Sequence, residues 1–421
     1  MYKSKMLYLE NKETFFSQRD CILIGGYAMV FLLFSLKLLP VNIAMSIAVT
    51  LFAISPLELL SSLYFFSLPW AYIGKFSFGL TISLLQSSIF LIRLIVEKQS
   101  MMLSRFELAV LFELLITASL ALIKYSSLTG VSLVFYYLIA CYLWHTYLLD
   151  NNKSSLFLQR SLFSVLISVA IAVIYGLIYR TGNNRWISGI GYSVQLYGTM
   201  GTSRLGYYLC ISMLYPLYFV KNKLPKILIC CFLTVGILAT VSMTAFIMMI
   251  FLYVVYFLSQ NGPSLRKIAI IGAVALGLLV VWIFANSISK ISFIQPIYTR
   301  IQLTITSLEN GDLNSATTGR ESLLESGIRR FQDSSMMEKI WGGQSLKDDG
   351  AMNTHNSYID MLNYTGILGA FFVSLLQVYR LLQYRKLAQK NILFLIKALT
   401  LLCACSTSVF FAQYWQILLY L

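Results

Sequence analysis

Long hydrophobic runs alternate with short polar breaks along almost the whole chain. Runs suited to crossing the roughly 30 Å apolar core of a bilayer, which takes about 20 helical residues, are expected near 21–39, 41–56, 57–73, 77–96, 106–124, 130–149, 161–179, 205–220, 225–241, 242–258, 267–285, 356–379 and 391–421. Only Pro56 divides 41–73, and 391–421 is either one long helix or two short ones broken near Ser406. The pattern predicts an all-α polytopic membrane protein with about 12–14 spans in a single domain, residues 1–421.

Composition supports the membrane class. Hydrophobic residues make up 58% of the chain and charged residues 12%, whereas soluble domains carry about 25% charged residues. No small-residue cleavage pattern follows the polar lead 1–20, so 21–39 is expected to be a retained first span.

The cations indicate an orientation, because short cytoplasmic loops collect Lys and Arg. With the N-terminus in the cytoplasm, the cytoplasmic segments hold Lys3, Lys5, Lys12, Arg19, Arg93, Lys98, Arg105, Lys153, Arg160, Lys221, Lys223, Lys226, Arg266, Lys267, Arg380, Arg385, Lys386 and Lys390. The short outer segments hold only Lys37, Lys75, Lys124, Arg180, Arg185 and Arg204. This asymmetry explains much of the net charge of +15, so we do not expect nucleic acid as a partner.

Two polar segments then lie on the extracytoplasmic face, a smaller loop at 180–204 and a large loop at 286–355. The smaller loop contains Arg180, Arg185 and Arg204, whose guanidinium groups match phosphate oxygens. Arg180 and Arg185 are equally explained as anchors to lipid headgroups. Arg204 opens an apolar run, where a charge more often has a function.

The large loop is expected to carry short helices. Apolar periodicity predicts one helix from Pro296 to Leu308, closed by Asn310-Gly311, and another over 320–332. Arg329 and Arg330 lie off the apolar face of the second helix, where they either contact glycan or lipid phosphate or belong to a solvated face.

The large loop ends in His355-Asn356-Ser357-Tyr358, at the start of the apolar run 356–379. The dipole of a helix beginning here disfavours imidazolium, so His355 is expected to be neutral and suited to general-base work. The alternative is that His355 is only an N-terminal cap or an interfacial residue.

A family resemblance favours the catalytic interpretation. His355-Asn356, nine residues and then Gly366-Ile367-Leu368-Gly369 resemble the H-[NSQ]-x9-G-x-x-[GTY] signature of the O-antigen polymerase and ligase family (Wzy and WaaL type). Upstream, Thr318-Gly319-Arg320 and Trp341-Gly342-Gly343 resemble the family's S/T-G-R and G-x-G passage. The resemblance covers residues 318–372 well and the other spans only as a general topology.

This chain departs from the family pattern in two places. Where the family often has a Ser-Arg or Ser-Lys pair at the outer end of a middle span, this chain has Ser242-Met243. In the smaller loop, Gly201-Thr202-Ser203-Arg204 replaces an Asn-Pro-Asn-like passage, which makes Arg204 the candidate to supply the missing cation.

The resemblance implies a GT-C-like glycosyltransferase of the bacterial cytoplasmic membrane that needs no metal or other cofactor. Its substrate would be an undecaprenyl-diphosphate-linked oligosaccharide, and its further partners membrane lipid and a chain-length regulator protein. In this interpretation His355 and Arg320 are catalytic, as general base and as clamp on the departing diphosphate. The substrate-binding candidates are Arg180, Arg185, Arg204, Arg329, Arg330, Asn356 and Tyr358, and the structural glycines are Gly319, Gly343, Gly366 and Gly369.

The leading function is a polysaccharide polymerase that joins repeat units with inversion. An O-antigen ligase or an O-oligosaccharyltransferase would show the same His and Arg pattern and differ in its acceptor. A flippase of lipid-linked oligosaccharides is the alternative from another class, but it predicts ionisable residues along the midplane, and few charges lie inside the apolar runs.

Four other ionisable residues and the cysteines are also considered for a functional role, because they lie in or next to apolar runs. His145 is expected to be interfacial, Glu113 and Lys397 to be charges within spans, and Asp360 to support His355. The seven cysteines all lie in apolar segments, which indicates packing rather than a disulfide framework or a metal site.

Overall fold

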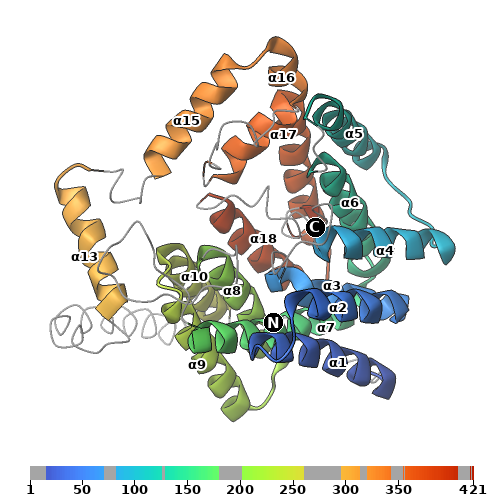
Figure 1. Ribbon diagram of the computed structural model, residues 1–421, viewed down its shortest axis with the longest axis vertical. Helices are drawn as coiled ribbons and strands as arrows, with labels where there is room; N and C mark the ends of the chain where they lie inside the picture. Colours follow the sequence, from blue (N-terminus) through green and yellow to red (C-terminus); the bar gives the residue numbers. More distant parts are fainter. Residues whose placement is uncertain are drawn as a thin grey trace, which may run out of the picture.

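The computed structural model describes residues 16–70, 82–125, 129–179, 202–259, 295–312, 320–342, 354, 356–405, 418, 420 and 421. Every regular element within these ranges is helical, as the sequence predicts, and Figure 1 shows their arrangement. The first half holds α1 (Gln18–Ser35), α2 (Val41–Ile54), α3 (Leu57–Ser67), η1 (Leu68–Trp70), α4 (Ile82–Val96), α5 (Arg105–Tyr125), α6 (Thr129–Leu143), η3 (Trp144–Leu148) and α7 (Asn151–Tyr179). The second half holds α8 (Thr202–Phe219), α9 (Lys223–Ala239), α10 (Met243–Ser259), α13 (Gln295–Glu309), α15 (Arg320–Asp333), α16 (Met336–Trp341), α17 (Ser357–Tyr384) and α18 (Lys390–Ala404).

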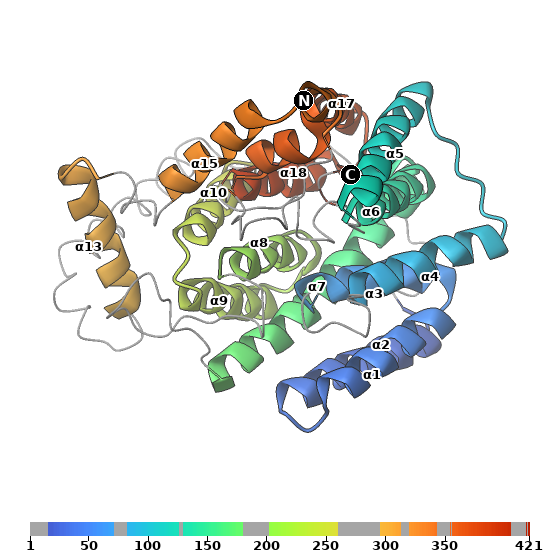
Figure 2. The same cartoon turned by 45° about the horizontal axis from the view of Figure 1, so that its top comes forward.

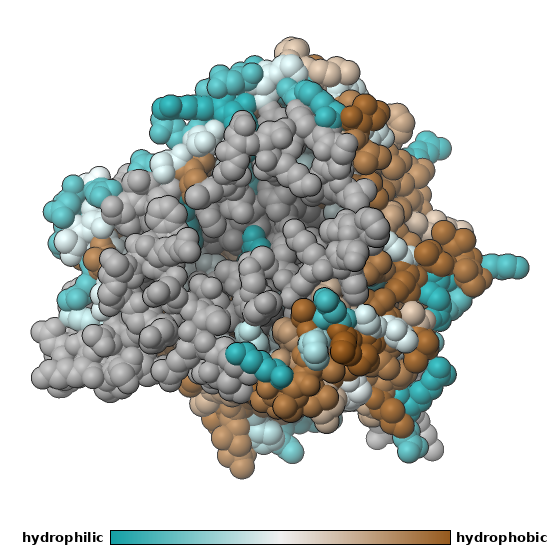
Figure 3. Space-filling view, in the orientation of Figure 1, coloured by the Kyte–Doolittle hydropathy of each residue, from teal (hydrophilic) through white to brown (hydrophobic). Residues whose placement is uncertain are grey.

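Several of these helices have the length and apolar character of membrane spans. In the described ranges, five qualify: Gln18–Ser35, Arg105–Lys124, Gly130–Leu148, Asn151–Gly176 and Ser357–Tyr384. Helices α2, α4 and α10 are apolar but shorter. Exposed apolar side chains such as Ile95 and Phe112 cover the α4 and α5 side of the molecule, where Figure 3 is brown. The chain is therefore consistent with a multi-pass membrane protein.

Helix α8 lies at the centre of the second half and packs against α7, α9, α10 and α18. Helix α17 packs against α5 on one side and carries α15 and α16 on another, which places α15 and α16 together at one end of the molecule in Figures 1 and 2. Helix α7 links the two halves because it contacts α1 and α3 as well as α8.

Several predicted boundaries are confirmed. Pro56 separates α2 from α3 and stands at the N-cap of α3, where its fixed φ is compatible with a helix start. The two helices expected in the 286–355 segment are present as α13 and α15. Gly311, just beyond α13, has a φ of 72°, the left-handed conformation that commonly ends a helix at glycine.

Other boundaries differ from the sequence prediction. Helix α7 begins at Asn151 rather than near residue 161, and α8 begins at Thr202, so Arg204 lies inside its first turn. Helix α17 continues to Tyr384, five residues beyond the expected end. Arg380 is therefore a fully buried helical residue and not a cation of a cytoplasmic loop. Helix α18 ends at Ala404, near the break considered at Ser406.

Candidate functional site

Two arginines that are far apart in the sequence, Arg204 and Arg320, both act electrostatically on one cysteine, Cys403. Arg204 is in the first turn of α8, Arg320 is the first residue of α15, and both side chains are partly buried. Both guanidinium groups lie within electrostatic range of Cys403, near the end of α18. The fold therefore places two of the predicted arginines, from separate helices, within electrostatic range of the same side chain.

Burial lowers the pKa of Arg320, because the charged form loses contact with water. A guanidinium nevertheless stays protonated in proteins. Among the ion pairs of the described residues, none involves Arg320. Arg320 is thus a partly desolvated cation, and a charge of this kind attracts an anion more strongly than one in bulk water does.

The start of α8 is held against the start of α10. The hydroxyl of Ser242 donates to that of Ser203 at 3.1 Å, and a Cβ added to Gly206 would lie 2.2 Å from the Cβ of Ala245. Only glycine permits this close approach of the two helices. These contacts fix the turn that carries Arg204.

Helix α15 is docked onto the first turns of α17. The amide nitrogen of Asn363 donates to the carbonyl of Gly327 at 3.1 Å. A Cβ added to Gly327 would lie 2.2 Å from Cγ2 of Thr354 and 3.0 Å from Cγ2 of Ile359. Because Gly327 lies in the middle of α15, this contact fixes where Arg320 at the start of the helix is placed.

The residues on both sides of position 355 are anchored to the start of α17. The side-chain oxygen of Asn356 accepts from the backbone N–H of Tyr358 at 3.0 Å and of Ile359 at 3.3 Å, which makes Asn356 the N-cap. Thr354 donates to Oδ1 of the buried Asp360 through its backbone nitrogen at 3.1 Å and is also 2.7 Å from it through its hydroxyl. Asp360 thus supports the neighbour of His355.

Tyr358 joins this neighbourhood from α17. Its hydroxyl lies within electrostatic range of Cys405, the C-cap residue of α18, and Cys405 in turn lies within range of Cys403. The starts of α8, α15 and α17 therefore each carry a residue within electrostatic range of a cysteine at the end of α18.

The predicted glycine motif lies at a break in α17. Gly366 has a φ of 68°, which interrupts the helix, and Gly342 at the end of α16 has a φ of 74°. A Cβ on Gly342 would lie 2.2 Å from the carbonyl oxygen of Tyr364, and one on Gly366 would lie 2.5 Å from the nitrogen of Gly342. Backbone therefore packs directly on backbone here, and both positions need glycine.

The second glycine of the motif, Gly369, faces α5. An added Cβ would lie 2.6 Å from Oε1 of Glu113, and the hydroxyl of Thr117 is 3.0 Å from that carboxylate oxygen and from the carbonyl of Trp341. Glu113 is thus a buried acid at the junction of α5, α16 and α17, and its Oε2 has no hydrogen-bond partner.

Arg329 and Arg330 are on α15 but not at its start. The helical rise places them about 14 Å along the axis from Arg320. Arg329 is exposed and pairs with Glu325 at 2.7 Å, while Arg330 has a buried Nη1 without a hydrogen-bond partner. They do not join the neighbourhood of Cys403.

Five predicted site residues lie outside the described residues: His355, Arg180, Arg185, Gly319 and Gly343. For His355 the flanking residues 354 and 356 are described, so the chain enters and leaves this position at the N-terminus of α17. The proposed roles of all five stay predictions.

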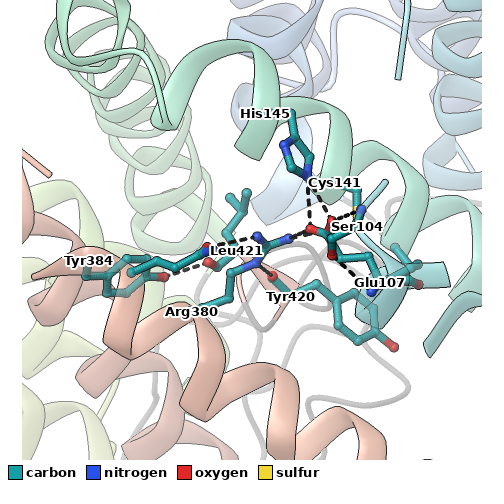
Figure 4. A network of polar contacts seen from close by, with 10 residues as sticks. Ser104, Glu107, Cys141, His145, Arg380, Tyr384, Tyr420 and Leu421 are labelled. Atoms are coloured by element: carbon teal, nitrogen blue, oxygen red, sulfur yellow. Dashed lines mark hydrogen bonds and ion pairs between the residues drawn. The ribbon is translucent and has the colours of Figure 1, made fainter. Parts of the chain in front are cut away.

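A separate group of buried charges connects α5, α17 and η3, which is a short π-helix (Figure 4). The Glu107 carboxylate accepts from Nη2 of Arg380 at 2.7 Å and lies 2.9 Å from Nε2 of His145. The Arg380 guanidinium also lies 4.2 Å from the ring centre of Trp144. The interfacial assignment of His145 is therefore incomplete, because the ring is only partly exposed and belongs to this ion cluster.

Lys397, the cation that the sequence predicts within a span, is also in the interior of the protein. Lys397 is buried, and its ammonium donates to Oε1 of Gln377 at 2.7 Å. Four cysteines, Cys141, Cys210, Cys230 and Cys403, are buried, and all seven are free thiols. Packing accounts for these four, although Cys403 lies beside the two arginines.

Sequence reasoning did not identify Cys403, Gly327 or Thr354. Each contacts a predicted residue or its neighbour only through tertiary packing, and none stands in a motif quoted above. The one available signal was Gly327 inside an otherwise good helical pattern, since an internal glycine often marks a close approach.

The arrangement suits an anionic ligand. Two guanidinium groups offer several N–H donors to phosphate oxygens, and the N-terminus of a long helix adds a favourable dipole. Comparison with protein-family models, with curated proteins and with solved structures finds no match to this chain.

Proposed function

We propose that this protein is a membrane glycosyltransferase that polymerises oligosaccharide repeat units carried on undecaprenyl diphosphate, with its site on the extracytoplasmic face of the bacterial cytoplasmic membrane. The observation that carries the proposal is that Arg204 and Arg320 both act electrostatically on Cys403 at the end of α18, while Tyr358 of α17, the helix that follows His355, is within electrostatic range of the nearby Cys405.

In this proposal Arg320 and Arg204 bind the donor's diphosphate. Their charges stabilise the negative charge that develops on the diphosphate as its bond to the anomeric carbon breaks. A metal ion is not required for this step, because the guanidinium groups supply the positive charge.

His355 takes the proton from the attacking hydroxyl of the acceptor sugar. The new bond forms on the face of the anomeric carbon opposite the leaving diphosphate, so the product has inverted configuration. Asn356 and Asp360 act indirectly in this scheme, since they hold the chain on both sides of His355.

The direct test uses the purified full chain and lipid-linked repeat units. His355→Ala and Arg320→Ala should each abolish the polymer ladder on a gel while leaving the single lipid-linked units intact. Arg105→Ala is the matched control, because Arg105 is exposed at the far end of α5. Polymer of normal length from His355→Ala would refute the general-base role.

The same assay separates polymerisation from the other candidate functions. Transfer to a lipid A core or to a protein acceptor, without a ladder on lipid-linked units, would identify a ligase or an oligosaccharyltransferase. Movement of lipid-linked units across a vesicle membrane without formation of any glycosidic bond would instead identify a flippase.

A further inference from the structure

A cavity of about 880 Å³ lies at the opposite end of α7 from Arg204. Helix α7 has 29 residues, so its two ends are separated by about 44 Å. The cavity is bounded by the starts of α1, α3 and α7, the end of α4, and the π-helical turn. It is therefore distinct from the candidate glycosyltransferase site and needs a separate explanation.

One wall of the cavity is aromatic. The rings of Tyr147 and Phe157 stack at 5.0 Å with an interplanar angle of 8°, and Tyr142 meets Tyr147 edge-on at 6.1 Å. Such a wall can hold an ammonium or a quaternary cation by cation–π attraction.

Carboxylates lie beside this aromatic wall. Glu58 acts electrostatically on Tyr142 and Tyr147, and Glu97 acts on Tyr142. Glu97 is already matched by Arg93, which donates to it at 2.7 Å. Among the ion pairs of the described residues none involves Glu58, so Glu58 offers a negative charge at the wall.

Four cations line the same cavity: Arg19, Arg93, Lys153 and Arg160. Arg160 lines the cavity from α7, acts electrostatically on Tyr147, and places its guanidinium 5.3 Å from the ring centre of Phe16. Arg19 lines it from the first turn of α1. The lining thus carries charges of both signs, with the carboxylates of Asp20, Glu58 and Glu97 beside these four cations.

Helices whose ends adjoin the cavity also carry exposed apolar side chains. Ile22 on α1 is 67% exposed, Ile54 on α2 58% and Ile92 on α4 57%. Large exposed apolar side chains beside a polar cavity are typical of a surface that faces lipid rather than water.

We propose that this cavity binds the headgroup of a zwitterionic aminophospholipid. The ammonium lies at Glu58 against the aromatic wall, the phosphate lies at Arg160 and Arg19, and the acyl chains run over the exposed apolar side chains of the neighbouring helices. A purely anionic headgroup would leave Glu58 unmatched and repelled, so phosphatidylethanolamine is favoured over phosphatidylglycerol. The proposal does not rest on the glycosyltransferase function.

The test measures lipid binding by native mass spectrometry of the full chain in detergent. We expect dioleoyl phosphatidylethanolamine to bind about tenfold more tightly than dioleoyl phosphatidylglycerol, a difference of about 1.4 kcal/mol. Glu58→Gln should remove this preference, and Arg19→Gln combined with Arg160→Gln should weaken binding of both lipids. Glu309→Gln, an exposed acid on α13, is the control and should leave the preference unchanged.

Three results would overturn the proposal. Phosphatidylglycerol could bind as tightly as phosphatidylethanolamine, or Glu58→Gln could retain the preference. Soluble phosphoethanolamine could bind as tightly as the lipid, which would identify a site for a water-soluble zwitterion. Thermal stability equal to that of the unmodified chain excludes misfolding as the cause of any loss, and because Glu58 is exposed, Glu58→Gln is expected to fold.

Discussion

The hydroxyls of Ser203 and Ser242 are 3.1 Å apart, so the first turn of α8 touches the first turn of α10. Arg204 follows Ser203, and Met243 follows Ser242. The position where the family resemblance expects a cation, 243, is therefore next to the turn that carries Arg204. In the proposed function, this contact is the reason for giving Arg204 the role of that cation.

A charge relocation tests this relationship. Arg204→Met should reduce polymer formation by about 10²–10³-fold, the usual loss when a preorganised donor to the transition state is removed. Adding Met243→Lys to Arg204→Met should restore part of the activity, because it returns a positive charge to the same place. The initial rate of polymerisation measures both effects.

Adding a charge elsewhere provides the control for that rescue. Thr306→Lys adds a cation on an exposed face of α13 and should not restore the Arg204→Met variant. Equal activities of the two double variants would show that position 243 has no special relation to the site.

The support of His355 by its neighbours can be tested at Thr354. Thr354→Val keeps the shape of the side chain but removes the hydroxyl that lies 2.7 Å from Asp360 Oδ1 and 2.9 Å from the carbonyl oxygen of Asn356. We expect about 10²-fold less polymerisation, because small misplacements of a catalytic group cost about that much. The loss of stability should stay near 1–3 kcal/mol, the cost of leaving a buried acceptor with fewer partners.

Kinetics and thermal unfolding of Thr354→Val should be measured side by side. Thr306→Val, on an exposed face of α13, is the matched control. Its polymerisation rate and its thermal stability should both be close to those of the unmodified protein. If Thr354→Val retained full activity, the anchoring of residue 354 would not matter for the reaction.

Much of the site was accessible from the sequence because its charges stand in unusual surroundings. Arg204 opens an apolar run, and Arg320 starts a segment with helical periodicity. That both lie within electrostatic range of Cys403 could not be predicted from the sequence, because it depends on how α8, α15 and α18 are placed in the fold. The sequence around a cysteine in an apolar segment does not reveal whether the buried thiol lies near a charged group.

The boundaries that failed have a related cause. Hydropathy predicts a span from residue 161 and places Lys153 and Arg160 in a cytoplasmic segment, whereas helix α7 already begins at Asn151 and carries both side chains into the lining of the cavity. A cation after an apolar run predicts a loop at Arg380. Arg380 is helical and buried instead, because it pairs with Glu107, which lies 273 positions away in the sequence. Hydropathy describes each segment alone and so cannot reveal such a pair.

The backbone contact between α16 and α17 gives a prediction on stability. Gly342→Ala and Gly366→Ala should each destabilise the protein, with about 1–3 kcal/mol from the positive φ alone and more from the clash with backbone atoms. Gly25→Ala is the control, because an added Cβ there meets nothing within 4 Å, and alanine in a helix interior stabilises by about 0.5–1 kcal/mol. Apparent melting temperatures in detergent should therefore fall for the first two variants and hold or rise for Gly25→Ala.

The buried ion pair predicts an asymmetry between its two partners. Removing one charge of a buried pair typically costs about 3–5 kcal/mol, because the other is left uncompensated. Glu107→Gln leaves the fully buried Arg380 without its carboxylate, whereas Arg380→Met leaves Glu107 with His145 at 2.9 Å. Glu107→Gln should therefore lower the melting temperature more than Arg380→Met does. Glu107→Leu combined with Arg380→Met should recover much of the loss, because no buried charge then lacks a partner. If the order of the single variants were reversed, His145 would not be compensating Glu107, and the cluster in Figure 4 would reduce to a simple pair.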